Sequence, residues 1–149
     1  MGEIANVCVV IWRGPVTPAR FAVQRAGLAE VARRHPGGIG LVCVVEPTAP
    51  PPGDDMRRAS AQMVRDHQSV LGAIACVVEG TGFVAALGRS VLSAMSLLVG
   101  TKKAPMTVVG TVAAASLWIA PRMGRRDGRA LEDAIESLRG RLAPWAGGR

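Results

Sequence analysis

The chain has few aromatic residues: two phenylalanines, three tryptophans and no tyrosine among 149 residues. Proteins that bind single-stranded nucleic acid stack its bases on aromatic side chains, so this composition disfavours that class. Phe21, Phe83 and Trp118 lie in apolar patterns, which places them in the hydrophobic core. We therefore expect no stacking surface for nucleic acid.

Cysteine is also scarce, and its three occurrences lie far apart. Cys8, Cys43 and Cys76 each fall inside a short apolar run, without the Cys-x-x-Cys spacing of metal or redox sites. Buried, reduced thiols are expected, and an odd number of cysteines is typical of a cytoplasmic protein. His35 and His67 have no neighbouring serine or cysteine that would complete a catalytic triad. We therefore predict no metal, no cofactor and no catalytic residue.

The sequence lacks both a secretory signal and a membrane-spanning run. Residues 1–6 contain an acid and no basic residue, and the apolar run Val7–Trp12 is too short for a signal peptide. The longest apolar segment, Phe83–Gly100, is interrupted by Arg89 and serines, whereas a membrane span needs about 20 apolar residues. These features predict a cytoplasmic protein without a membrane span.

Positive charge exceeds negative charge, with 18 Lys and Arg against 11 Asp and Glu and a net charge of +7. Such a balance permits nonspecific attraction to nucleic acid at low salt, for which the basic segment Arg122–Arg129 is the best candidate. All basic residues except Lys102 and Lys103 are arginine, as expected for a bacterium with a GC-rich genome. Because this bias explains the charge, we do not expect dedicated nucleic-acid binding.

Three short segments share one pattern, a small apolar residue followed by Cys, Val and Val. They are Val7–Val10, Val42–Val45 and Ala75–Val78. Continuous β-rich runs bounded by glycine, proline and polar residues are typical of strands covered on both faces of a sheet. A further run at Met106–Gly110 predicts a fourth strand.

The stretches between these strands have helical spacing. Apolar residues recur every three or four positions in Pro18–Arg34 and Asp54–Leu71, and the apolar segment Phe83–Val99 is assigned to a buried helix. Threonine and aspartate caps predict two more helices, over residues 111–120 and 127–142. Strands that alternate with helices imply parallel pairing through right-handed crossovers.

These elements fit one domain, because 149 residues is an ordinary domain size. We predict a single α/β domain over residues 1–149, with a mostly parallel four- to five-stranded sheet flanked by helices. Residues 121–149 make up its C-terminal helix and tail. The strand order cannot be derived from the sequence.

Two acidic residues follow the second and third of the cysteine-containing strands. Glu46 and Glu79 each come three residues after the cysteine, so both should lie at the carboxyl edge of the sheet, where open parallel sheets bind ligands. Facing one crevice, they could perform acid–base chemistry. Alternatively, they are solvated strand ends, or they pair with Arg57, Arg58 or Arg89.

A glycine-rich turn, Gly80-Thr81-Gly82, follows Glu79 and leads into the predicted apolar helix. Free backbone N–H groups at such a helix start can hold an anion, although the turn lacks the third glycine of a dinucleotide fingerprint and the lysine of a phosphate-binding loop. A purely structural turn is the alternative. The candidate ligand-binding residues are Glu46, Glu79, Gly80, Thr81 and Gly82.

Residues 47–53 contain four prolines, which predicts a stiff, extended loop of polyproline character. Such a loop could present a surface to a partner that recognises proline-rich segments. Its position between a predicted strand and a predicted helix explains it equally as a connector, and we favour that interpretation.

The chain resembles the SpoIIAA-like branch of the STAS domains in the segment Val9–Thr17, V-V-I-W-R-G-P-V-T, followed by a helix and then by V-V-E-P and V-V-E-G-T-G-F. The resemblance extends from about Val7 to Ala120. It implies a sheet of four or five strands flanked by helices, and binding of proteins or small apolar ligands. Members that antagonise anti-sigma factors carry a phosphorylatable serine or threonine, for which only Thr48 is available here, so we transfer no phosphorylation site.

Only six residues precede Val7, so the N-terminal strand pair of that family looks shortened and an exposed sheet edge is expected. This edge and the apolar segment Phe83–Val99 favour a homodimer. The sequence therefore leads to a non-enzymatic regulatory module that binds an unidentified protein partner. The alternative is a carrier of a small apolar or anionic ligand.

Overall fold

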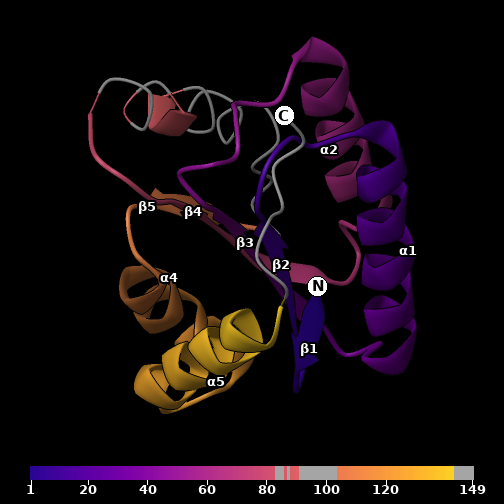
Figure 1. The fold of residues 1–149 in the computed structure, drawn as a ribbon. Helices are drawn as coiled ribbons and strands as arrows, with labels where there is room; N and C mark the ends of the chain where they lie inside the picture. The colour runs from indigo at the N-terminus through magenta and orange to yellow at the C-terminus, as the bar shows by residue number, and fades with distance from the viewer. Residues whose placement is uncertain (83–85, 87, 91–103, 143–149) are drawn as a thin grey trace.

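The computed structural model describes residues 1–82, 86, 88–90 and 104–142, and its strands form one five-stranded sheet (Figure 1). The spatial order of the strands is the same as their order in the sequence, with an antiparallel first pair and parallel pairs after it. The predicted α/β class with a mostly parallel sheet is confirmed. The strands are β1 (Gly2–Ile4), β2 (Val7–Trp12), β3 (Ile39–Val45), β4 (Leu71–Val78) and β5 (Met106–Val109).

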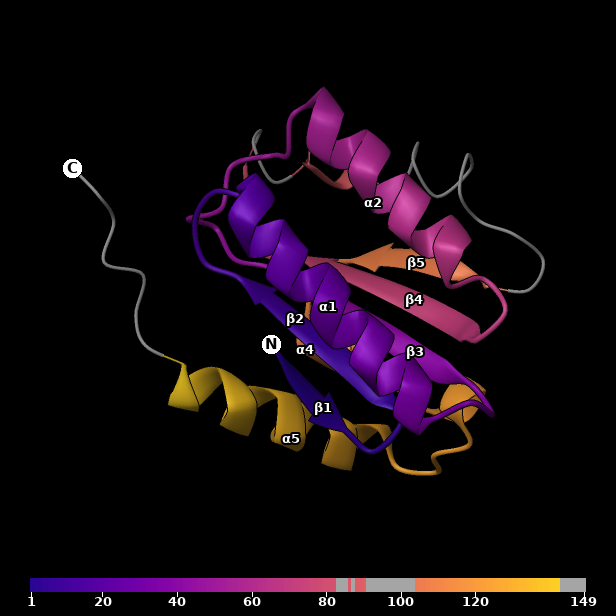
Figure 2. The same cartoon turned by 90° about the vertical axis from the view of Figure 1, so that its right-hand side faces the viewer.

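Helices cover both faces of the sheet. Helices α1 and α2 lie on one face, and α4 and α5 lie on the other (Figures 1 and 2). No helix within the described ranges is long and apolar enough to cross a membrane. The helices are α1 (Pro18–Arg34), α2 (Asp54–Asp66), α4 (Val112–Ile119) and α5 (Gly128–Arg141), and a 3₁₀ turn covers Pro121–Met123.

Most predicted elements are present, although β3 and β4 begin earlier than the predicted runs Val42–Val45 and Ala75–Val78. The side chains of Thr111 and Asp127 cap α4 and α5 as predicted. The predicted helix Asp54–Leu71 ends earlier, at Asp66, because residues 67–70 form a turn and β4 begins directly after it. Strand β1 is not evident in the sequence pattern, since three residues are too few to show an alternation. The predicted helix 83–99 lies outside the described residues, except that residues 86 and 88–90 are helical.

Two hydrophobic clusters pack against the two faces of the sheet. In β2, Cys8 belongs to the cluster under α1 and α2, whereas Val7 and Val9 belong to the cluster under α4 and α5. Burial on both faces explains why the strands are continuous apolar runs. Cys43 and Cys76 pack on the same side as Cys8, so all three cysteines lie under α1 and α2.

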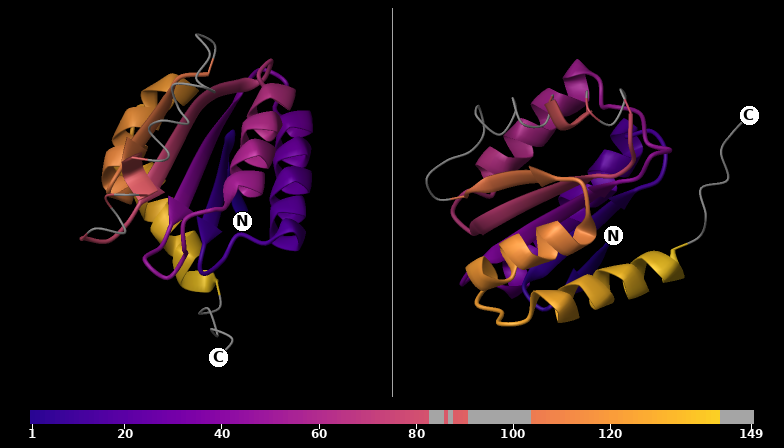
Figure 3. Two further views of the ribbon diagram at one scale, coloured as in Figure 1. Left: turned by 90° about the horizontal axis from the view of Figure 1, so that it is seen from above. Right: turned by 90° about the vertical axis from the view of Figure 1, so that its left-hand side faces the viewer.

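A close crossing of α4 and α5 directs α5 along the sheet (Figure 3). Gly128 is the first residue of α5, and a Cβ atom there would lie 3.1 Å from the Cα of Leu117 and 3.2 Å from the carbonyl oxygen of Ser116. Glycine therefore allows α5 to begin in contact with α4. From this start the helix extends to the carboxyl edge of the sheet, where its last turn carries Arg139.

Candidate functional site

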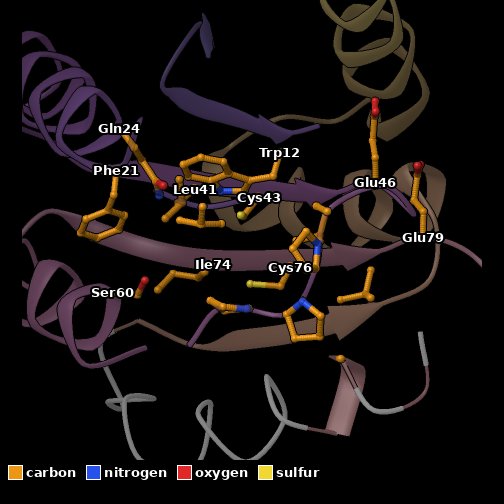
Figure 4. A pocket seen from close by; sticks show the side chains of 18 of the residues that line it. Trp12, Phe21, Gln24, Leu41, Cys43, Glu46, Ser60, Ile74, Cys76 and Glu79 are labelled. Atoms are coloured by element: carbon orange, nitrogen blue, oxygen red, sulfur yellow. The ribbon is translucent and has the colours of Figure 1, made fainter. Parts of the chain in front are cut away.

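An apolar cavity of about 480 Å³ lies between the sheet and the α1–α2 layer (Figure 4). Small-molecule sites typically have volumes of about 300–1,000 Å³. Strands β2 to β5 supply the floor, α1 and α2 supply walls, and the proline-rich loop closes one side. The floor includes Trp12, Leu41, Cys43, Val45, Ile74, Cys76, Val78 and Met106, and the walls include Phe21, Gln24, Ala49, Pro50, Pro51, Pro52, Ser60, Ala61, Met63 and Val64.

The predicted acidic residues lie at the rim of this cavity. Glu46 follows β3 and Glu79 follows β4, so both are at the carboxyl edge of the sheet as expected. Figure 4 shows their carboxylates pointing away from the cavity floor. Arg139 of α5 binds both of them: its Nε donates to Glu46 Oε1 at 2.8 Å, and its Nη1 donates to Glu79 Oε1 at 2.8 Å.

Arg13, which follows β2, completes this group. Its Nε donates to Glu46 Oε1 at 2.9 Å and to Oε2 at 3.0 Å. Its two terminal nitrogens donate to the carbonyl oxygens of Leu142 and Arg139, at 2.8 and 3.0 Å. Carbonyl groups in the last turn of a helix have no partner inside the helix, so Arg13 caps α5. We name Arg13, Glu46, Glu79 and Arg139 the edge cluster.

The edge cluster holds α5 against the carboxyl ends of three strands. The side chains of Arg139, Glu46 and Glu79 are 19, 13 and 20% exposed. The hydrogen bonds that Arg139 donates to Glu79 and to Glu46 raise the pKa of Arg139 above its ordinary value, although burial opposes the shift. Glu46 binds both guanidinium groups and Glu79 binds that of Arg139. The four side chains form one ion-pair network, and this geometry favours a structural role for both carboxylates.

The arginine partners suggested by the sequence for Glu46 and Glu79 are wrong. Arg57 and Arg58 instead pair with aspartates one helical turn away, at the start of α2, and Arg89 donates to the carbonyl oxygen of Val78. Arg57 and Arg58 pair with Asp54 and Asp55 because side chains three residues apart on a helix are neighbours. Nothing in the sequence marks the actual partners, which are far away along the chain.

The glycine-rich turn also reaches the cavity. Gly80 and Thr81 line it, and Gly82 follows them. Gly80 and Gly82 have φ angles of 99° and 91°, a region that only glycine adopts readily, so the turn itself accounts for both glycines. The helix start proposed to bind an anion lies outside the described residues, and that binding stays a prediction.

Gln24 and Ser60 are polar residues of the cavity wall that the sequence analysis did not identify. Gln24 is 6% exposed and lies in the buried stripe of α1 between Phe21 and Leu28. Its side-chain amide makes no hydrogen bond to another residue in the described part of the chain. The sequence feature that could have identified Gln24 is its polar side chain at a position where the helical spacing of α1 predicts an apolar residue.

Cys8 and Cys76 are buried, and Cys43 is partly buried. Burial raises the pKa of Cys8 to about 11 and that of Cys43 to about 12, with a contact to Trp12 partly opposing the shift at Cys43. Cys43 and Cys76 are register partners on adjacent strands, and both line the cavity. All three cysteines are free in this structure, and their reduced state stays a prediction.

The raised pKa of Cys8 predicts a loss of stability at alkaline pH. Above pH 9 the unfolded thiol ionises, whereas the folded thiol stays protonated until about pH 11. The free energy of unfolding therefore falls as the pH rises through this window. Between pH 8 and pH 10 the fall should be smaller in Cys8→Ala than in the wild type by about 1 kcal/mol, measured by urea unfolding at each pH. Equal falls in both proteins would refute this assignment.

Comparisons of the chain with protein-family models, curated proteins and solved structures found no match. Within the described residues, no group of three or more His, Cys, Asp or Glu side chains is arranged to hold a metal ion.

Proposed function

We propose that this protein binds a small, uncharged and mainly apolar molecule in the cavity between the sheet and helices α1 and α2. The main observation that supports this proposal is the cavity. This concave space measures about 480 Å³ and is lined mostly by apolar side chains. A concave apolar site with a few polar groups is the usual form of a ligand site.

The charges around the cavity support an uncharged ligand. Among the described lining residues, only Glu46 and Glu79 are acidic and none is a lysine or arginine. Both carboxylates are already bound by Arg139. A buried anion would find no cationic partner on these walls, and an unpaired buried charge is strongly unfavourable. This argues for the apolar ligand over the anionic one that the sequence left open.

The regulatory protein-binding role implied by the STAS-like resemblance stays a prediction, as does the homodimer. The described surface offers no observation that favours either. Its most exposed large apolar residues, Val23 and Leu117, are each 66% exposed, but they lie on α1 and α4, on opposite sides of the sheet (Figure 1). They therefore do not form one contact patch.

The proposal is tested with the neutral fluorescent probe N-phenyl-1-naphthylamine. We expect the wild type to bind the probe with enhanced fluorescence, and Ala61→Phe to weaken binding by at least about tenfold, because Ala61 lines the cavity and the larger side chain would occupy its volume. The matched control is Gln62→Phe on the exposed side of the same helix, which should bind as the wild type does. Absence of binding to the wild type, or equal weakening in both variants, would contradict the proposal.

A further inference from the structure

We infer that Gln24 is the polar recognition group of the cavity, and that the preferred ligand is a neutral molecule whose apolar body carries a carboxamide. This inference rests on the proposed function and adds the chemical class of the ligand. A glutamine amide offers N–H donors and a carbonyl acceptor side by side. A ligand carboxamide presents the complementary pair, so the two groups can form two hydrogen bonds.

The first observation that supports this role is the burial of Gln24. The residue is 6% exposed and lines the cavity, and its amide end extends from α1 toward the sheet beside Trp12 and Leu41 (Figure 4). Within the described part of the chain the amide has no hydrogen-bond partner. Buried polar groups are nearly always hydrogen-bonded, and leaving one unpaired is costly. The amide atoms keep accessible surface toward the cavity, because neither belongs to the fully enclosed side-chain atoms that lack a partner. Their hydrogen-bond partner is therefore water or a bound molecule inside the cavity.

The position of Gln24 at one end of the cavity predicts the orientation of a bound ligand. Figure 4 shows Gln24 and Ser60 at one end, Cys43 and Cys76 in the middle, and the rim carboxylates at the other end. A ligand held by Gln24 would therefore place its polar group between α1 and α2 and its apolar body over the thiols. Thiols behave as small hydrophobic groups, so they suit that part of the ligand.

The end of the cavity at Gln24 also excludes the ionised analogue of such a ligand. Ser60, whose hydroxyl is neutral, lines the same end of the cavity from α2. A carboxylate in place of the carboxamide would accept hydrogen bonds from Gln24, but none of the described residues that line the cavity is a lysine or arginine that would pair with it. Desolvation of the charge opposes that binding, so the carboxamide should bind more tightly than the carboxylate of the same body.

The test compares three naphthalene ligands that differ in one substituent: naphthalene-2-carboxamide, naphthalene-2-carboxylate and 2-methylnaphthalene. Their affinities are measured at pH 8 by displacement of N-phenyl-1-naphthylamine. For the wild type we expect the carboxamide to bind about tenfold more tightly than 2-methylnaphthalene, and the carboxylate to bind less tightly than the carboxamide. In Gln24→Leu the carboxamide should bind no more tightly than 2-methylnaphthalene, because its amide would be buried without the partner that Gln24 supplies, while 2-methylnaphthalene keeps its wild-type affinity.

Two further variants make the result specific to the amide of Gln24. Gln24→Met keeps the length of the side chain and should lose the carboxamide preference as Gln24→Leu does, whereas Gln62→Leu on the exposed side of α2 should retain it. Equal wild-type affinities for carboxamide and 2-methylnaphthalene, or tightest binding of the carboxylate, would overturn the role of Gln24 while leaving the apolar cavity as a binding site. Failure of the wild type to bind the fluorescent probe at all would overturn the proposed function as well.

Discussion

Replacing Arg139 with methionine should lower the free energy of unfolding by about 2 kcal/mol. Methionine keeps much of the length of the side chain but removes the ion pairs with Glu46, Glu79 and Glu136. Glu79 then loses this cationic partner, whereas Glu46 keeps Arg13. Breaking a fully buried ion pair costs about 3–5 kcal/mol. The smaller value is expected because the side chains of Arg139, Glu46 and Glu79 are 13 to 20% exposed. Urea unfolding followed by circular dichroism measures the change.

The matched control is Arg33→Met on α1. Arg33 pairs with Glu30, but their side chains are 73 and 44% exposed, and exposed pairs contribute little. This variant should unfold within about 0.5 kcal/mol of the wild type. Adding Glu79→Gln to Arg139→Met should restore part of the loss, because a neutral amide no longer leaves an unpaired charge. A loss in Arg139→Met no larger than that in Arg33→Met would show that the edge cluster does not hold α5 in place.

Leucine at two adjacent positions of β4 should have opposite effects on stability. Cys76 faces the cavity, whereas Ala75 is fully buried in the cluster on the other face. Cys76→Leu should raise the free energy of unfolding by about 1 kcal/mol, because it adds buried apolar area without collision. Ala75→Leu should lower it by about 1–3 kcal/mol, because the added carbons have no space in a packed core.

The same pair of variants distinguishes an effect on ligand binding from an effect on stability. Cys76→Leu should bind N-phenyl-1-naphthylamine more weakly than the wild type despite its higher stability, since the leucine occupies ligand volume. Urea unfolding supplies the stability change, and fluorescence titration supplies the affinity. If Cys76→Leu destabilises the protein as much as Ala75→Leu does, the space above Cys76 is not available to a ligand, and the proposed site is incorrect.

The α/β class and most helix boundaries followed from short-range features of the sequence. Each cysteine-containing strand is an uninterrupted apolar run, which is the pattern of a strand buried on both faces. Helices α4 and α5 begin directly after the capping residues Thr111 and Asp127, and a cap acts within three residues of itself. These signals involve only residues that are close together in the chain. The sequence therefore determined these elements and placed Glu46 and Glu79 at the carboxyl edge.

The partners of those carboxylates and the cavity itself were decided only by the tertiary structure. Glu46 binds Arg13, 33 residues before it, and Arg139, 93 residues after it, and no local pattern couples such distant positions. The cavity likewise depends on how far α1 and α2 stand from the sheet, which is set by packing among segments remote in sequence. The burial of the Gln24 amide in the cavity likewise depends on the tertiary structure, because it results from the packing of α1 against the sheet and not from the sequence of α1 alone.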